Sequence, residues 1–231
     1  MTARGRAKAP APRITQLRLD HLEPADPAEL VRGARIDGLA FGDVETAHLD
    51  LSSGVVMECS FTDVGADEAD LRSTKLRDTV ISRARLPSLR AGRGDWRDVR
   101  VEGTRIGSAE MYENSWSSVH FVDCKVTYLN LRGATLRDVT FTRCAIEELD
   151  LGGASARSVA FLDSSVQVLD VQRAELEAVD LRGAQLHRIT GLSQLRGAIV
   201  SSAQLHQLAP LLAAEFGIVI DDAAPPEIAR T

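Results

Sequence analysis

Aromatic residues are scarce in this sequence, at 4% of 231 residues, so a folded core must be built from aliphatic and small side chains. No apolar run approaches the roughly 18 residues that a membrane-spanning helix needs. The first 13 residues are basic but contain no apolar segment, which excludes a secretory signal of the usual kind. Three cysteines are too few for a disulfide framework in a chain of this length, so a reducing cytoplasm is the expected location.

Sequence motifs of catalysis are also lacking. There is no glycine-rich phosphate loop and no HExxH, CxxC or GxSxG motif. We therefore expect neither an enzyme nor a cofactor. The histidines are scattered, and those in the repeat described below fall at outward positions, so no metal site is expected. They are His21, His48, His120, His187 and His206.

Apolar residues recur at every fifth position over most of the chain. Of the 31 positions from Ile36 to Leu186 taken in steps of five, only Thr46 is not apolar. The positions two residues earlier, from Ala34 to Ile189, are small or aliphatic except for Asn114. Two inward residues separated by one outward residue are typical of a strand, but the next inward residue three positions later requires a turn. The pattern predicts a coil that bends every five residues around an apolar interior.

A second period of 20 residues sets the number of sides of this coil. Five of the six phenylalanines share one column of that period. Four five-residue units per turn predict a square coil of about eight turns, and a rod about 37 Å long at ~4.8 Å per turn. The phenylalanines of the column are Phe41, Phe61, Phe121, Phe141 and Phe161.

Individual units resemble a known repeat. Ala69–Ser73 (ADLRS), Leu149–Gly153 (LDLGG) and Val179–Gly183 (VDLRG) are similar to the A(D/N)LXX unit of pentapeptide-repeat proteins. The resemblance extends over roughly residues 31–190 and implies an all-β solenoid, a right-handed quadrilateral β-helix. The motif describes a core rather than a site, so it indicates the fold more specifically than the function.

The ends of a solenoid need caps, and the sequence outside the repeat is expected to supply them. Ser202 is predicted to begin a C-terminal helix that Pro210 kinks or splits and Gly217 ends, followed by a short strand at 218–220. The expected parts are a disordered basic tail (1–13), an N-terminal cap (14–30), the β-helix (31–190), a helical cap (191–220) and a flexible tail (221–231).

Some residues of the repeat leave two interpretations open. Cys124 and Cys144 lie one coil apart, which would suit a metal site or a disulfide. We favour the alternative that they are small core residues. Asn114 points inward, so it is expected to find backbone partners or a trapped water. The glycine- and arginine-rich stretch 87–95 is either a protruding loop or part of the coil.

Trp96 and Trp116 also share a column one coil apart. We expect them to be bulky core residues or a patch against which a loop packs. A platform that binds a ligand is the less favoured alternative.

Charge is distributed in bands along the predicted rod. Residues 36–70, here called the acidic band, hold nine acidic side chains and no Lys or Arg. Residues 72–105, the basic belt, hold ten basic and four acidic side chains, and residues 106–190 carry a net charge of −4. Duplex DNA of the same length would carry about 22 negative charges, against a net −7 for residues 36–190. Only the acidic band is as densely charged as DNA.

In its size and in the acidic charge of the rod, the chain also resembles the quinolone-resistance branch of the family, the MfpA- and Qnr-type proteins, which bind DNA gyrase and protect it from inhibitors. The resemblance implies a DNA-mimic-like protein that binds gyrase or another topoisomerase and modulates or protects it, in antibiotic resistance or self-immunity. The partner-binding residues are then expected in the acidic band. They are Asp43, Glu45, Asp50, Glu58, Asp63, Asp67, Glu68 and Asp70.

The resemblance to the MfpA-type proteins further implies a homodimer joined through the C-terminal segment. Such a tail-to-tail dimer would place the two acidic bands at its far ends. The apolar residues expected at the dimer interface are Leu205, Leu208, Leu211, Leu212, Phe216, Ile218 and Ile220.

A second hypothesis is a protein–protein interaction solenoid with no role at a topoisomerase. A DNA mimic has no need of the basic belt. The belt would instead bind a partner of opposite charge pattern, or the acidic band of a second copy of the chain. Direct nucleic-acid binding through the belt and the basic N-terminus is disfavoured by the net charge of −6. Neither a small-molecule substrate nor a membrane is an expected partner.

Overall fold

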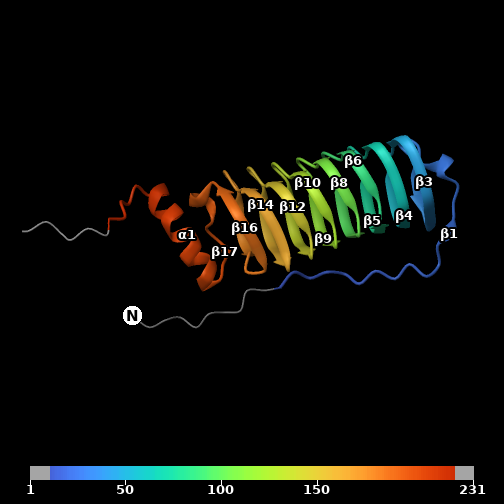
Figure 1. The fold of residues 1–231 in the computed structure, drawn as a ribbon. Helices are drawn as coiled ribbons and strands as arrows, with labels where there is room; N and C mark the ends of the chain where they lie inside the picture. The colour runs from blue at the N-terminus through green and yellow to red at the C-terminus, as the bar shows by residue number, and fades with distance from the viewer. Residues whose placement is uncertain (1–10, 222–231) are drawn as a thin grey trace, which may run out of the picture.

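The computed structural model describes residues 11–221 as an all-parallel, right-handed quadrilateral β-solenoid of about nine turns with one short C-terminal helix (Figure 1). The predicted fold class is confirmed. The coil is longer than predicted because a two-residue strand at each end extends the pairing. Strand β1 (Glu23–Pro24) pairs with β3, and β17 (Ala198–Ile199) pairs with β15. Residues 1–10 and 222–231 of the expected tails lie outside the described residues.

Each regular coil consists of an eight-residue strand, a bend, a six-residue strand and a turn, as in β11 and β12. Every strand pairs in parallel with the strand one coil away, so that Phe141 lies beside Phe161. The remaining strands are β2 (Arg35–Asp37), β3 (Leu39–Asp50), β4 (Val55–Asp70), β5 (Lys75–Ser82), β6 (Arg85–Arg90), β7 (Asp95–Glu102), β8 (Arg105–Glu110), β9 (Ser115–Val122), β10 (Lys125–Asn130), β11 (Thr135–Thr142), β12 (Ala145–Asp150), β13 (Ser155–Leu162), β14 (Ser164–Asp170), β15 (Glu175–Asp180) and β16 (Ala184–Thr190).

The corners of the coil use left-handed backbone. Gly133, Asp138 and Arg143 follow one another at five-residue intervals with φ values of 64°, 54° and 51°. Equivalent residues have positive φ in the neighbouring coils, which produces three columns of left-handed residues along the rod. Glycine and aspartate suit such positions better than arginine does, so the stacking of the coils determines the conformation at Arg143.

Stacked aromatic rings fill one column of the interior. Phe121 and Phe141 lie with ring centroids 5.3 Å apart, and Phe141 and Phe161 with centroids 5.0 Å apart. Trp96 and Trp116 stack at 5.6 Å and are buried, which confirms their interpretation as core residues. An apolar cavity of about 40 Å³ lies beside Phe61 where Ile81 continues the phenylalanine column.

The stretch 87–95 is regular coil, which settles the two interpretations left open by the sequence. Strands β6 and β7 keep the five-residue register through it, with Leu89 and Trp96 buried. A Cβ atom on Gly92 would lie 2.7 Å from the Tyr112 ring, and one on Gly94 would lie 3.1 Å from the Thr74 carbonyl oxygen. The glycines therefore reflect close packing of neighbouring coils, not a loop.

The C-terminal end of the coil is closed by α1 (Ser202–Glu215), preceded by the 3₁₀ turn η2 (Leu192–Gln194). The predicted helix exists, but its N-cap is Ser201 instead of Ser202, because Ser201 forms a capping box with Gln204. The Gln204 side chain also donates to the carbonyl oxygens of Leu181 and Ala184, at 2.7 and 2.9 Å. The helix thereby satisfies backbone acceptors of the last coils.

Two further expectations for this segment are corrected. The helix is not split at Pro210 but continues through it as one element, and the backbone hydrogen bond that proline lacks would have gone to His206, an exposed residue. Gly217 ends the helix as predicted, with φ 69° and its N–H bonded to the Ala214 carbonyl at 3.1 Å. Residues 218–220 form no strand, since no strand edge lies beside them.

The N-terminal end is covered by β1, the 3₁₀ turn η1 (Pro27–Glu29) and the buried Leu30. Residues 11–22, here called the N-terminal arm, run back along the side of the coil (Figure 1). Their course differs from the sequence expectation, which placed residues from 14 onward in the cap. Among the residues that the structure describes, no helix is both long and apolar enough to cross a membrane.

Removal of one stacked ring tests the dependence of the fold on the aromatic column. Phe141→Ala is expected to lower the free energy of unfolding by about 3–5 kcal/mol, because it removes a fully buried ring between two others. Chemical denaturation monitored by circular dichroism measures the change. Glu147→Ala, on an exposed position of the same coil, serves as the control and should leave the midpoint nearly unchanged.

Candidate protein-binding surface

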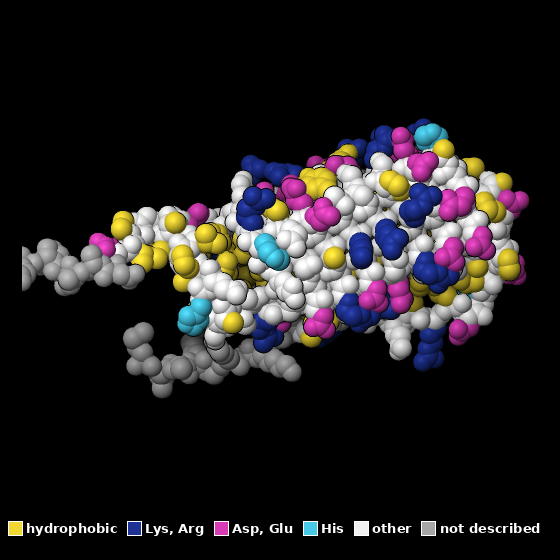
Figure 2. Space-filling view, in the orientation of Figure 1, with side chains coloured by type: hydrophobic (Ala, Val, Ile, Leu, Met, Phe, Trp, Pro, Cys, Tyr) yellow, Lys and Arg dark blue, Asp and Glu magenta, His cyan; other side chains and the backbone are white. Residues whose placement is uncertain are grey.

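The acidic band encircles the N-terminal coils instead of forming one flat patch. Glu58, Asp63 and Glu68 are spaced by five residues, which is one side of a 20-residue coil, so they lie on three successive sides. Figure 2 shows acidic and basic side chains mixed over this end of the rod, away from α1. The charged side chains counted in the sequence therefore form rings around the rod. How these side chains pair locally determines which charges are available to a partner.

Arginines of the basic belt pair with the acidic band one or two coils away. Arg83 binds the Asp63 carboxylate through two hydrogen bonds of 2.8 and 2.6 Å. Arg85 lies 3.0 Å from Glu45 and 3.6 Å from Asp67. These contacts neutralise the band locally, and they arise because residues 20 apart are neighbours in the coil.

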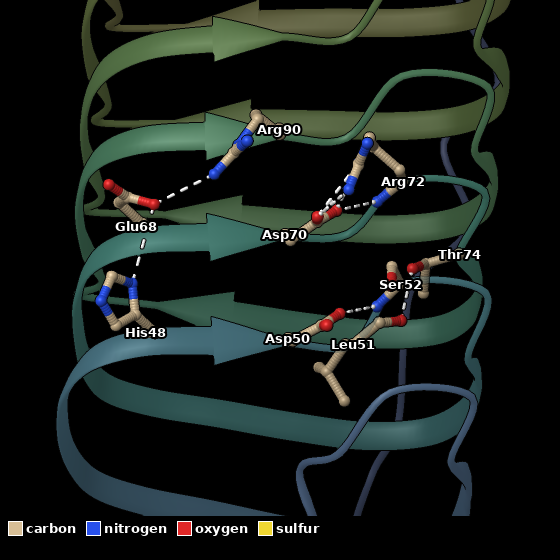
Figure 3. A network of polar contacts seen from close by, with 9 residues as sticks. All are labelled: His48, Asp50, Leu51, Ser52, Glu68, Asp70, Arg72, Thr74 and Arg90. Carbon is tan, nitrogen blue, oxygen red and sulfur yellow. Dashed lines mark hydrogen bonds and ion pairs between the residues drawn. The ribbon is translucent and has the colours of Figure 1, made fainter.

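The same pairing continues on another side of the coil (Figure 3). Arg90 donates to Glu68 at 3.0 Å, and His48 approaches the same Glu68 oxygen at 3.6 Å. Arg72 forms a two-pronged contact with Asp70, whose Oδ1 atom also accepts the Arg72 backbone N–H at 3.1 Å. Band and belt are thus joined by several separate ion pairs on different sides of the coil.

Asp50 and Asp70 also shape the turns that follow their strands. The Asp50 carboxylate accepts the Ser52 backbone N–H at 2.9 Å, and Asp70 accepts that of Arg72 in the same way (Figure 3). Asp150 repeats the contact with Gly152 at 2.8 Å. An aspartate that bonds the backbone two residues ahead stabilises a turn, so these residues have a structural role.

Ion pairing lowers the pKa of two carboxyls of the acidic band. The Arg83 guanidinium beside Asp63 lowers the pKa of that carboxyl, and the Arg72 guanidinium lowers the pKa of Asp70 despite partial burial. Both are therefore charged near neutral pH and already hold a cation. Of the eight band residues named from the sequence, Asp43 and Asp50 have no ion-pair partner among the described residues, and Glu58 has only His21, which is a cation only when protonated.

The structure also decides between the interpretations of the inward polar residues. Cys124 and Cys144 are buried free thiols, and the hydrogen bond between them together with burial raises the pKa of Cys144. The Asn114 side-chain oxygen accepts the Gly94 backbone N–H, as expected of a structural residue. Within residues 11–221, no three His, Cys, Asp or Glu side chains are grouped so that they could hold a metal ion.

The C-terminal residues predicted for dimerisation divide into two groups. Leu208 is buried and Leu212 is partly buried against the core, so both close the end of the coil. The others lie at the surface, and Figure 2 shows apolar side chains gathered at the α1 end. The exposed fractions are Leu205 50%, Leu211 47%, Phe216 67%, Ile218 61% and Ile220 62%, and the neighbouring Val219 is 85% exposed.

A sequence model of a known family, described as the pentapeptide repeat region, matches residues 94–170. These residues form coils β7–β14 with the 20-residue spacing described above. The chain carries a pentapeptide-repeat region. The resemblance predicted from its five-residue units is thereby confirmed.

Solved structures similar to this chain include two named proteins. QnrB1, a plasmid-mediated fluoroquinolone resistance protein, is 18% identical, with a TM-score of 0.43 over 85% of this chain and 95% of its own. HetL, a pentapeptide repeat protein involved in heterocyst differentiation regulation from the cyanobacterium Nostoc sp. strain PCC 7120, is 16% identical, with a TM-score of 0.24 over 74% of this chain and 90% of its own. No curated protein matches the chain.

Sequence reasoning found the band and the belt but missed their pairing. The signal was present in the offsets, since Asp63 and Arg83 are 20 residues apart, as are Asp123 and Arg143. Both pairs occupy the same left-handed column of the pentapeptide-repeat coil. The N-terminal arm and its contacts gave no comparable signal, because the arm lies outside the repeat.

Substitution of one belt arginine tests whether the pairs exist in solution. Arg83→Gln is expected to raise the pKa of Asp63 toward its ordinary value, because the carboxylate loses its cation. Carbon-13 NMR titration of the Asp63 carboxyl measures the shift. A pKa lowered by folding stabilises the folded state above the ordinary carboxyl pKa, and this contribution is lost as pH falls through the folded value. The variant should therefore lose less stability in acid.

Arg143→Gln is the matched control, because Arg143 pairs with Asp123 in the same geometry at 2.7 and 2.8 Å. It should shift the pKa of Asp123 and leave Asp63 unchanged. An unaltered Asp63 titration in Arg83→Gln would show that the pair does not form.

Proposed function

We propose that this chain is a non-enzymatic β-solenoid that binds a protein partner through its charged N-terminal coils. The observation that carries the proposal is the set of exposed ion pairs held at fixed positions on a rigid coil, of which Arg83–Asp63 and Arg90–Glu68 are examples. A repeating scaffold presents such charges in a constant geometry, which gives electrostatic specificity to an interface.

The partner we propose is DNA gyrase or a related type II topoisomerase, which the chain would modulate or protect from inhibitors. Support comes from the resemblance of the chain to the quinolone-resistance branch in size and in acidic charge, which reaches a net −9 in residues 36–70. Because the belt neutralises most of the band, we propose recognition of a mixed-charge surface with Asp43 and Asp50 as its unpaired carboxylates, not imitation of the uniform charge of DNA.

An interaction solenoid with no topoisomerase role is the second candidate. The observation in its favour is the same pairing, since arginines at 83, 85 and 90 would meet the positively charged surface of a DNA-binding groove. Under this reading the partner carries both signs of charge.

A supercoiling assay distinguishes the two candidates. The full chain is titrated into DNA gyrase with relaxed plasmid, with and without a quinolone. Binding to gyrase predicts inhibition of supercoiling at micromolar or lower concentration, or rescue of activity from the drug. Asp43→Asn with Asp50→Asn should weaken the effect about tenfold or more, because an interfacial charge contact contributes of that order. Asparagine suits the left-handed backbone of Asp43 and retains the turn contact of Asp50.

Glu147→Gln with Glu148→Gln removes the same charge from exposed positions outside the band and is the matched control. It should retain the activity of the unmodified chain. No effect of the chain on supercoiling or on drug-stabilised cleavage would refute the topoisomerase proposal and leave the second candidate.

We also propose that two copies associate through the C-terminal segment. The support is the exposed apolar cluster from Leu205 to Ile220, in which Phe216 and Ile218 are more than half exposed. Apolar clusters of this kind on a soluble chain mark interaction sites. Because α1 and the strands β3 and β4, which carry most of the acidic band, lie at opposite ends of the rod (Figure 1), the bands would face outward in this dimer.

Phe216→Asp with Ile218→Asp is expected to convert the dimer to a monomer, because two charges would be buried in the interface. Sedimentation velocity measures the change in mass. Val31→Asp places a charge on an exposed apolar residue near the N-terminal end of the rod and should leave the dimer intact. A chain that is monomeric without substitution, or dimeric with Phe216→Asp and Ile218→Asp, would contradict the proposal.

A further inference from the structure

The N-terminal arm is held on the coil mainly by its own backbone. The Arg13 backbone N–H donates to Asp138 Oδ1 at 3.0 Å, and the Thr15 backbone N–H donates to Ser118 Oγ at 2.9 Å. At the other end of the arm, the His21 Nε2 atom lies 2.8 Å from Glu58 Oε2. Contacts through backbone N–H groups depend on an extended chain more than on the identity of its side chains.

The arm follows one column of the coil at two residues per turn. Residues 13, 15 and 21 contact residues 138, 118 and 58, so eight arm residues span eighty coil residues, or four coils. The arm therefore runs antiparallel to the direction in which the coil advances. The backbone contacts of Arg13 and Thr15 are two arm residues and one coil apart, and the His21 side chain contacts the same column further along, so the arm is attached at several coils and not at a single point.

The column beneath the arm consists of polar residues in left-handed backbone that stack in register. Five successive members are oxygen acceptors, and three of them are half-buried aspartates that form no ion pair within residues 11–221. Burial raises the pKa of Asp78, as do the neighbouring charges of Asp98 and Glu58. The members are Glu58, Asp78, Asp98, Ser118 and Asp138, with φ from 46° to 58°.

Shallow grooves accompany the arm on both sides of this column. One of about 340 Å³ lies between Ile14 and Leu17 of the arm and Val80 and Val99 of the coil. A second, of about 320 Å³, lies beside Arg13 and Asp138. No side chain of residues 11–22 is fully buried. The arm thus gains little apolar burial, and a segment of this kind opens at low cost in free energy.

We infer that this side of the coil is a binding surface for an extended peptide, and that the N-terminal arm is its resident, releasable occupant. The ligand class is an extended segment with the pattern of residues 11–22, in which the backbone N–H groups of residues 13 and 15 donate to the acceptor column and apolar side chains such as Ile14 and Leu17 line the groove. A segment of a partner protein with this pattern would take the place of the arm. The inference holds whether or not the partner is a topoisomerase.

Two pairs of substitutions in the full chain test the arm and the surface independently. Arg13→Pro with Thr15→Pro removes both backbone donors from the arm and leaves the column intact. Ser118→Gly with Asp138→Gly removes the acceptors and suits the left-handed backbone at both positions. Gln16→Pro is the control, because it introduces proline at an exposed arm residue whose N–H makes no hydrogen bond within the described residues.

Release of the arm is read from tryptic cleavage after Arg18. Both pairs of substitutions are expected to accelerate cleavage about tenfold or more, since each removes two hydrogen bonds. Gln16→Pro should be cleaved at the rate of the unmodified chain. Unchanged cleavage in both pairs would overturn the inference, and the near-ultraviolet circular dichroism of Trp96 and Trp116 reports whether each variant keeps its fold.

Occupation of the surface is read from the fluorescence anisotropy of a labelled peptide with the sequence of residues 11–22. It should bind the Arg13→Pro, Thr15→Pro chain about tenfold or more tighter than the unmodified chain, whose own arm competes. It should not bind the Ser118→Gly, Asp138→Gly chain. Equal binding to all three chains, or binding to none, would overturn the inference. Dissociation of a dimer by the Ser118→Gly, Asp138→Gly substitutions would also overturn the inference. It would mean that the arm of one copy binds the column of a neighbouring copy.

Discussion

Stacking of equivalent residues one coil apart is the constraint on which the rest of this structure depends. Because strands pair in parallel with an offset of 20 residues, each side chain lies beside the residues 20 before and 20 after it. In the interior this requirement aligns Phe121, Phe141 and Phe161 in a column of rings. On the exterior it makes each charged residue a neighbour of the residues 20 positions away in the sequence. Packing and electrostatics therefore follow the same 20-residue offset.

That rule explains how much could be predicted from the sequence. The five-residue alternation and the phenylalanine column predicted a coil with four sides, because burial leaves a periodic trace in residue type. The pairing of Arg83 with Asp63 leaves a trace as well, but it becomes visible only when charges are compared column by column instead of being summed along the chain. A sum over residues 36–70 suggests a bare acidic surface, whereas the coil places a guanidinium beside most of it.

Features that the sequence did not predict lie outside the repeat or depend on a single local contact. The capping box of Ser201 requires the side chain of Gln204, and Ser202 is an equally good candidate on residue type alone. The glycines at 92 and 94 have the composition of a loop and instead accommodate the Tyr112 ring and the Thr74 carbonyl. The arm has no periodicity of its own, since its register is determined by the coil it lies on.

The closure of the two ends has a consequence for how the rod behaves in a crowded solution. An open coil end presents a parallel strand edge that could receive the first coil of another molecule, and repetition of that contact would produce an unlimited fibre. Pro24 in β1 has no N–H to offer such a neighbour, and Gln204 occupies the carbonyl oxygens of Leu181 and Ala184 at the other end. A glutamine side chain at one end and a proline ring at the other thus leave fewer free backbone groups to which another molecule could pair.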